Sequence, residues 1–183
     1  MKKIVVSVLG YDRPGIVASV SKVMFENRCN IEDVSQTILQ TEFAGVFIAS
    51  IPEELQEEDL LSCLEERLAP MDLSVLLKPM RAVGDWMAPE SAPFVLTTRG
   101  PDRLGLVVGI TEVMVRFGIN ITNLKAVFRG GEDPLRNIMI YEVDIPVETD
   151  QHGFREALQE RARELGLEFN LQHRDIFEAI HRI

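Results

Sequence analysis

The chain has 183 residues, of which 46% are hydrophobic and 26% are charged, and its formal net charge is −10. These proportions are typical of a globular protein, and no apolar run approaches the roughly 18 residues that a membrane-spanning helix needs. The excess of acidic residues disfavours direct binding of nucleic acid, because such binding depends on neutralising phosphate groups.

The cysteines and the N-terminus indicate the compartment. Cys29 and Cys63 are the two cysteines, and neither lies in a CxxC motif. The first residues have the pattern of a β-strand, which is interrupted by charged residues before any signal-peptide cleavage site. We therefore expect reduced thiols, buried or half-buried, in a cytoplasmic protein.

In chain order, the first half is predicted to form a strand, a helix, two strands, a helix and a strand. The expected ranges are 3–9, 16–24, 31–40, 46–51, 53–68 and 73–77. Asp12 is the expected N-cap of the first helix, with Pro14 in its first turn. Residues 42–45 lie where a hairpin turn is expected between the two middle strands.

The second half is predicted to repeat this βαββαβ order. The expected ranges are 94–98, 106–117, 121–128, 138–145, 154–165 and 167–171. Residues 129–134 lengthen the middle hairpin, and residues 81–92, which include Trp86, have the composition of a linker. The sequence therefore predicts an α+β protein with domains at 1–80 and 93–175, a linker at 81–92, and a C-terminal helix at 176–183 that covers a sheet or pairs with a second chain.

A long internal repeat supports this division. Residues 10–17 return as residues 100–107, and the match continues without a gap to Asn30-Ile31 and Asn120-Ile121. Because the offset of ninety residues holds through a helix and into the next strand, the repeated element is a whole folded unit.

The repeated glycine-containing loops are the candidate binding sites. Glycine allows backbone to approach a ligand closely, and the helix that follows presents unpaired N–H groups that suit a carboxylate. Asp12 is placed to hold an ammonium group, and the amide of Asn30 can bond either group. The candidate ligand-binding residues are Asp12, Gly15, Ile16, Val17, Asn30 and Ile31 in the first copy, and Asp102, Gly105, Leu106, Val107, Asn120 and Ile121 in the second. The alternative interpretation is that both aspartates are N-caps and the glycines are turn residues.

Catalytic signatures are missing from the sequence. The three histidines are scattered, and there is no HExxH, GxSxG, P-loop or GxGxxG motif. The acidic run at 53–59 is typical of a solvated helix start rather than of a metal site. We therefore predict no catalytic residues, no metal and no cofactor.

The first half resembles the ACT domain family. The resemblance rests on Asp-Arg-Pro-Gly-Ile-Val at 12–17, on Cys-Asn-Ile-Glu-Asp at 29–33 and on Glu-Phe at 42–43 within one βαββαβ unit. That family is ferredoxin-like, with an antiparallel sheet and helices on one face, and its members commonly bind amino acids or other small effectors near this loop. The tandem layout without an enzyme domain is similar to the family of glycine cleavage system transcriptional repressors. In the second copy, Leu104 replaces the proline of the motif.

The resemblance implies a regulatory protein rather than an enzyme. It implies a small amino acid or related carboxylate as effector and a partner protein, such as a transcriptional regulator of glycine or amino-acid metabolism. It also suggests allosteric action and a homodimer. In that family the effector site often lies between two ACT units. Two alternatives stay open at this point: a trans-acting regulatory subunit of a biosynthetic enzyme, and a protein-interaction module that binds no ligand.

Overall fold

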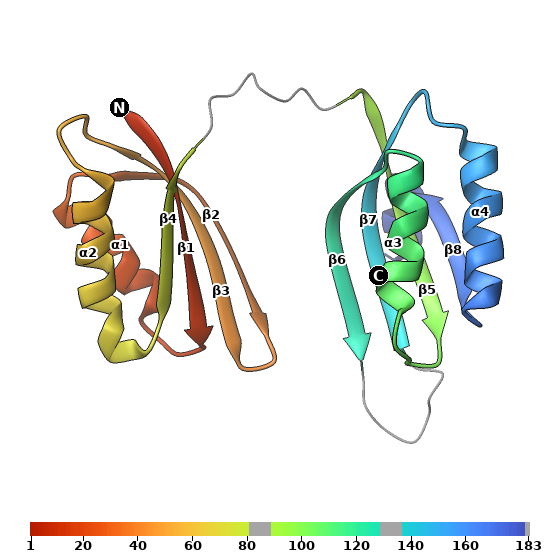
Figure 1. Ribbon diagram of the computed structural model, residues 1–183, viewed down its shortest axis with the longest axis horizontal. Coiled ribbons are helices and arrows are strands. Elements are labelled where there is room, and N and C mark those ends of the chain that lie inside the picture. The colour runs from red at the N-terminus through yellow and green to blue at the C-terminus, as the bar shows by residue number, and fades with distance from the viewer. Residues whose placement is uncertain (81–88, 129–136, 182–183) are drawn as a thin grey trace. The chain divides into compact units, whose positions relative to one another are not determined.

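The chain folds into two compact units, Met1–Asp85 and Trp86–Ile183, in a computed structural model that describes residues 1–80, 89–128 and 137–181 (Figure 1). Both units have the βαββαβ order, which confirms the predicted α+β fold. Most of the expected linker, with Trp86, and the lengthened hairpin at 129–134 lie outside the described residues.

The first unit, called unit 1, contains four strands and two α-helices. Its elements are β1 (Lys2–Tyr11), α1 (Ile16–Glu26), β2 (Asn30–Leu39), β3 (Glu42–Ile51), α2 (Glu57–Leu68), the short 3₁₀ turn η1 (Ala69–Met71) and β4 (Ser74–Pro79). The sheet is antiparallel with strand order β2-β3-β1-β4, and Figure 1 shows α1 and α2 on the same side of it.

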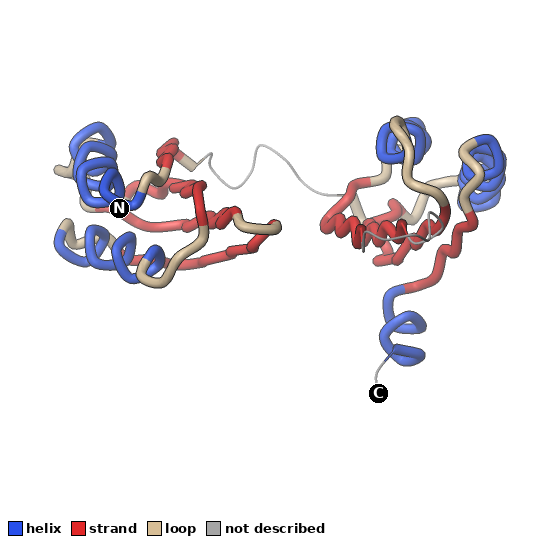
Figure 2. Tube along the Cα trace, turned by 90° about the horizontal axis from the view of Figure 1, so that it is seen from below, coloured by secondary structure: helices blue, strands red, loops and turns tan. Residues whose placement is uncertain are grey.

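The second unit, called unit 2, repeats this arrangement and adds a helix. Its elements are β5 (Ser91–Gly100), α3 (Leu106–Arg116), β6 (Asn120–Phe128), β7 (Asn137–Pro146), α4 (Gln151–Glu164), β8 (Glu168–His173) and α5 (Arg174–His181). The strand order is β6-β7-β5-β8, again antiparallel. The C-terminal helix α5 starts at Arg174, two residues before the predicted range, and lies on the side of the sheet opposite α3 and α4 (Figure 2).

Alternation along the strands explains the core of each unit. In β1, every second side chain from Ile4 to Val8 points toward the helices and is buried, together with the apolar stripes of α1 and α2. Unit 2 builds an equivalent core around Leu96 and Tyr141. Because successive strand residues point to opposite faces, each sheet has a helix-covered face and a second, open face.

The turn of the first hairpin differs from the prediction. Residues 40–41 form the turn, with Gln40 in the left-handed region at φ 57°, and β3 begins at Glu42. The expected turn residues 42–45 belong to β3 instead, because Phe43 is a core residue and pairs with Gly10. Gly45 makes room for the Phe43 ring, since a Cβ at Gly45 would lie 2.7 Å from that ring.

Candidate functional site

The loop between β1 and α1 begins with a tight contact rather than with an open glycine. A Cβ on Gly10 would lie 2.9 Å from the carbonyl oxygen of Asp72 and 2.8 Å from the side chain of Leu73. Gly10 therefore allows β1 to pass close to the start of β4, and the interpretation that it leaves room for a ligand is wrong. Gly100 makes the equivalent contact in unit 2, at 2.9 Å from the oxygen of Gly166.

Gly15 lies at the helix start and is accessible. It is the N-cap of α1 in the left-handed region at φ 100°, and a Cβ there would meet nothing within 4 Å. The first helical hydrogen bond runs from Ser19 N–H to Gly15 O at 2.9 Å, so the N–H groups of residues 15–18 have no partner inside the helix. These N–H groups form the positive end of the helix dipole.

The aspartates of the two loops are therefore not helix N-caps. Gly15 and Gly105 occupy the N-cap positions of α1 and α3, and neither helix has a side-chain cap. Pro14 lies before the N-cap instead of in the first turn of the helix. The alternative interpretation of Asp12 and Asp102 as caps is thus wrong, because the left-handed glycine starts each helix three residues later.

A small cavity lies against this helix start in unit 1. Its volume is about 170 Å³, and residues of the loop, of β2 and of β3 surround it. The lining residues are Asp12, Arg13, Gly15, Ile16, Val17, Ala18, Gln36 and Phe43. The backbone N–H of Asp12 donates to Thr41 O at 2.8 Å, which ties the loop to the hairpin turn. The Arg13 guanidinium lies over the Tyr11 ring, 5.9 Å from its centroid.

The polarity of this cavity is divided. Free N–H groups at the start of α1 are suited to an anionic group, and the half-buried Asp12 carboxylate is suited to a cationic one. Gln36 adds an amide that both donates and accepts, and the buried Phe43 supplies an apolar wall. The side chain of Ile16 is buried in the core, so its contribution to the cavity is mainly its backbone. The arrangement suits a small molecule that carries a carboxylate and an ammonium group.

The structure separates Asn30 from this loop. Asn30 pairs with Ser50, which pairs with Lys3, whereas the loop follows Gly10 at the other end of β1. The separation is about 23 Å along the strand, from a rise of roughly 3.3 Å per residue. The expectation that Asn30 lies beside the loop is therefore wrong within one unit, and Gln36, near the opposite end of β2, takes that place. Sequence spacing gave no signal for Gln36, because only strand register brings it there.

Three further predicted residues, Ile31, Asn120 and Ile121, also lie away from the loops. Ile31 packs against the core of unit 1 and Ile121 against that of unit 2. Asn120 pairs with Asp144, which pairs with Pro93 at the start of β5, far from the loop that follows Gly100.

The loop of unit 2 has a different polar set. Asn137 occupies the position of Phe43, is buried, and donates from Nδ2 to Oδ1 of Asp102 at 3.2 Å. The side chain of Leu104 is fully exposed, Leu106 is buried in the core, and Val107 is exposed. Gly105, at φ 90°, keeps the open helix start. Since Asp102 already accepts a hydrogen bond, the two loops are not chemically equivalent.

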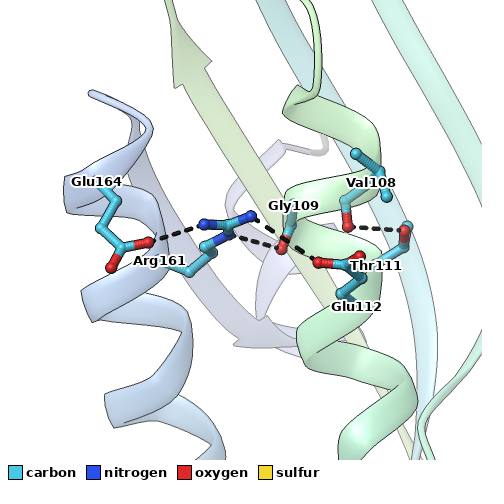
Figure 3. A network of polar contacts seen from close by, with 6 residues as sticks. All are labelled: Val108, Gly109, Thr111, Glu112, Arg161 and Glu164. Atoms are coloured by element: carbon cyan, nitrogen blue, oxygen red, sulfur yellow. Dashed lines mark hydrogen bonds and ion pairs between the residues drawn. The ribbon is translucent and has the colours of Figure 1, made fainter.

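A larger cavity of about 750 Å³ lies between α3 and α4 of unit 2. Figure 3 shows Arg161 of α4 reaching toward α3 across this groove. Its Nε donates to Gly109 O at 3.4 Å, its Nη1 to Glu164 at 2.8 Å, and its Nη2 lies 3.9 Å from Glu112. All three guanidinium nitrogens contact the protein itself, so the side chain of Arg161 joins the two helices and is not left to bind a ligand in this groove. We therefore place the candidate site at the β1–α1 loop of unit 1.

Other chemical groups offer no competing site in the part of the chain that the structure describes. Within it, no cluster of three or more His, Cys, Asp or Glu side chains could hold a metal ion. No helix among the described residues is long and apolar enough to cross a membrane. Cys29 is half-buried, and burial raises the pKa of its thiol. Cys63 is exposed on α2, so the expectation that it is buried or half-buried is wrong.

Comparison with known proteins identifies the family. A model of the ACT domain matches residues 2–78. A UPF0237 protein of Methanosarcina acetivorans is 34% identical over 94 residues, which cover 51% of this chain and 98% of that protein. A UPF0237 protein of Methanosarcina mazei matches with the same identity and coverage.

Two solved structures resemble the chain over nearly its whole length. A protein described as unknown, from Galdieria sulphuraria, has a TM-score of 0.77 and 25% identity, over 94% of this chain and 98% of that one. A putative glycine cleavage system transcriptional repressor has a TM-score of 0.63 and 18% identity, over 93% of this chain and 96% of that one, which shows the same fold. With two ACT-like units in tandem, the chain belongs to the UPF0237 family of ACT-domain proteins.

Proposed function

We propose that this protein is a non-enzymatic regulator that senses a small amino acid, or a related carboxylate, at the β1–α1 loop of unit 1. The observation that carries the proposal is the cavity of about 170 Å³, in which the free N–H groups of the α1 start face the same space as Asp12 and Gln36. ACT domains generally sense small ligands for regulation, and this cavity lies at the loop that carries the family motif.

The size of the cavity favours a small effector. Pockets for drug-sized ligands have volumes of roughly 300–1,000 Å³, so a cavity of about 170 Å³ suits a molecule with few heavy atoms. The carboxylate of such an effector would accept from the N–H groups of α1, and its ammonium group would contact Asp12. This set of contacts selects a zwitterion over a simple acid or amine, because both charged groups need a partner when they leave water.

The proposed output is a change in affinity for a partner protein. An effector that binds one state of the protein more tightly shifts the population toward that state, and a partner that distinguishes the states responds. A net charge of −10 makes a protein partner better suited than DNA itself. We propose that this partner acts in the cytoplasm, in the transcriptional control of glycine or amino-acid metabolism.

A thermal-shift screen of the twenty amino acids tests the proposal. An effector at about one hundred times its Kd should stabilise the protein by about 2.7 kcal/mol. The best hit is then compared with the matching acid and the matching amine, each of which should give a much smaller shift. Asp12→Asn should abolish the shift, and Asp102→Asn is the matched control at the corresponding position of unit 2, where Asn137 already occupies the carboxylate.

Two results would overturn the proposal. The first is a screen in which none of the twenty amino acids, and no small carboxylate added to the same screen, stabilises the protein. The second is a hit whose shift is unchanged in Asp12→Asn and in Gln36→Ala, because that effector would bind elsewhere. Isothermal titration calorimetry of the same variants separates a lost site from a general loss of stability.

A further inference from the structure

The ring of Phe43 is the apolar wall of the cavity at the β1–α1 loop. Phe43 lies on the helix-covered face of the sheet (Figure 1), is 2% exposed, and belongs to the core of unit 1. It pairs with Gly10, two residues before Asp12, so the wall lies directly beside the loop. Because close packing holds a core side chain in place, the ring sets a fixed limit to the depth of the cavity.

Gly45 determines where this ring lies. A Cβ added to Gly45 would lie 2.7 Å from Cζ and 2.8 Å from Cε1 of Phe43, so the ring rests on the backbone of Gly45 in space that only glycine leaves free. Gly45 is not one of the glycines with positive φ, and it pairs regularly with Val8 and Gln36. The glycine at this position is therefore explained by the space for the ring and not by the backbone conformation.

The strand register brings the amide of the cavity to the same place. Gln36 of β2 pairs directly with Gly45, so the two residues lie on the same face of the sheet. Gln36 and Phe43 then line the cavity together with the start of α1. The size of the cavity and its polar contacts on the sheet side thus depend on three neighbouring positions.

Unit 2 has different residues at all three positions. By strand register, the counterparts of Phe43, Gly45 and Gln36 are Asn137, Met139 and Ala126. The larger apolar side chain of the strand pair has moved from the first position to the second, where Met139 is 2% exposed. Since the fold accepts both arrangements, a phenylalanine that rests on a glycine is a property of the unit 1 cavity and not a requirement of the fold.

The volume of the cavity indicates which effectors the wall admits. A water molecule takes about 30 Å³ of the liquid, so a cavity of about 170 Å³ holds roughly six non-hydrogen atoms. Glycine, alanine and serine are close to this size, whereas leucine and phenylalanine are larger. A longer side chain would have to displace the Phe43 ring, and a close-packed core resists that displacement.

We propose that the Phe43 ring, resting on Gly45, is the size filter of the effector site and restricts the site to amino acids whose side chain is no larger than that of serine. This inference rests on the proposed function, because it concerns the same cavity. Asp12 and the N–H groups of α1 bind charged groups that all amino acids share, so they do not distinguish side chains. Phe43 is a specificity-determining residue, and its replacement changes which amino acid binds.

Isothermal titration calorimetry of the full chain with glycine, alanine, serine and leucine tests the filter. In the wild type, the best of the three small amino acids should bind at least about tenfold more tightly than leucine, since one methylene group in a pocket is worth about tenfold or more. Phe43→Leu removes part of the wall and should reduce this ratio at least about tenfold. Phe47→Leu is the matched control and should keep the ratio, because Phe47 is a fully buried phenylalanine of the same strand and face that does not line the cavity.

Gly45→Ala changes the wall in the opposite direction. The added Cβ would push the ring off the strand and into the cavity that it lines, so every amino acid should bind more weakly, serine more so than glycine. Circular dichroism of each variant checks folding. An unchanged ratio in folded Phe43→Leu, or unchanged affinities in Gly45→Ala, refutes the filter.

The failure of the filter and the failure of the proposed function give different results. If leucine binds the wild type as tightly as the small amino acids, and Asp12→Asn abolishes binding of both, the filter is refuted and the effector site stands. If none of these amino acids binds the wild type, the proposed function and the filter fail together.

Discussion

Replacing Tyr141 with phenylalanine tests how the core of unit 2 holds a polar group. Tyr141 is 0% exposed, and its hydroxyl donates to the sulfur of Met139 at 3.3 Å. Phe47 fills the corresponding position of unit 1 and is equally buried, so this fold accepts phenylalanine there. Because a thioether is a weak acceptor, Tyr141→Phe should change the free energy of unfolding by less than about 1 kcal/mol at neutral pH.

The difference should appear at alkaline pH. Burial raises the pKa of Tyr141 from its ordinary value of 10.0 to about 12, because the folded protein favours the neutral phenol. The unfolded chain ionises first, so the stability contributed by the neutral phenol is complete below about pH 10 and is lost as the pH rises toward about 12. For a single site with these two pKa values, the loss at about pH 11 is about 1.4 kcal/mol. The phenylalanine variant lacks this loss.

Urea unfolding followed by circular dichroism, at about pH 8 and about pH 11, measures the effect. The quantity of interest is the loss of unfolding free energy between the two pH values in the wild type minus the same loss in Tyr141→Phe, which removes contributions common to both proteins. Tyr11→Phe is the control, because Tyr11 is the other tyrosine of the chain and is 56% exposed. Equal losses in the wild type and in Tyr141→Phe would refute the reasoning that this phenol is held in a low-dielectric core.

Three further changes test the loop and the edge of unit 1. Gly10→Ala should lower the free energy of unfolding by about 1–3 kcal/mol, since the added Cβ would lie 2.9 Å from the carbonyl oxygen of Asp72. An unchanged midpoint of urea unfolding would contradict this packing. In Gly15→Ala the added Cβ would contact no neighbour. The variant should lose only the strain of holding alanine at φ 100°, about 1–2 kcal/mol of unfolding free energy, and its far-UV circular dichroism should be unchanged. Lys3 lies 2.6 Å from Glu32 and lowers its pKa, so the pair stabilises the fold above the ordinary pKa of 4.5 and loses this effect as the pH falls. Lys3→Met should raise the Glu32 pKa in an NMR titration, and no change would show that the ion pair is absent in solution.

Much of the fold follows from local patterns along the chain. The repeat of residues 10–17 at 100–107 sets two units, and the alternation of apolar residues sets the order of strands and helices in each. The main error is the hairpin turn, which the glycine at position 45 favoured. Gly45 instead lies in β3 under the ring of Phe43, and this contact depends on packing that no local pattern contains.

The sequence by itself determined the duplicated units and the order of their strands and helices, because these depend on residues close together in the chain. The structure then moved the N-cap of each first helix from the aspartate to the left-handed glycine three residues later. Only the tertiary structure decided which distant residues meet: strand register places Gln36 beside Asp12 and removes Asn30 to the other end of the sheet. It also decided that Asn137 occupies the carboxylate of Asp102 in unit 2. Such contacts join residues far apart in sequence, and they form only when packing of the core selects one register for each strand.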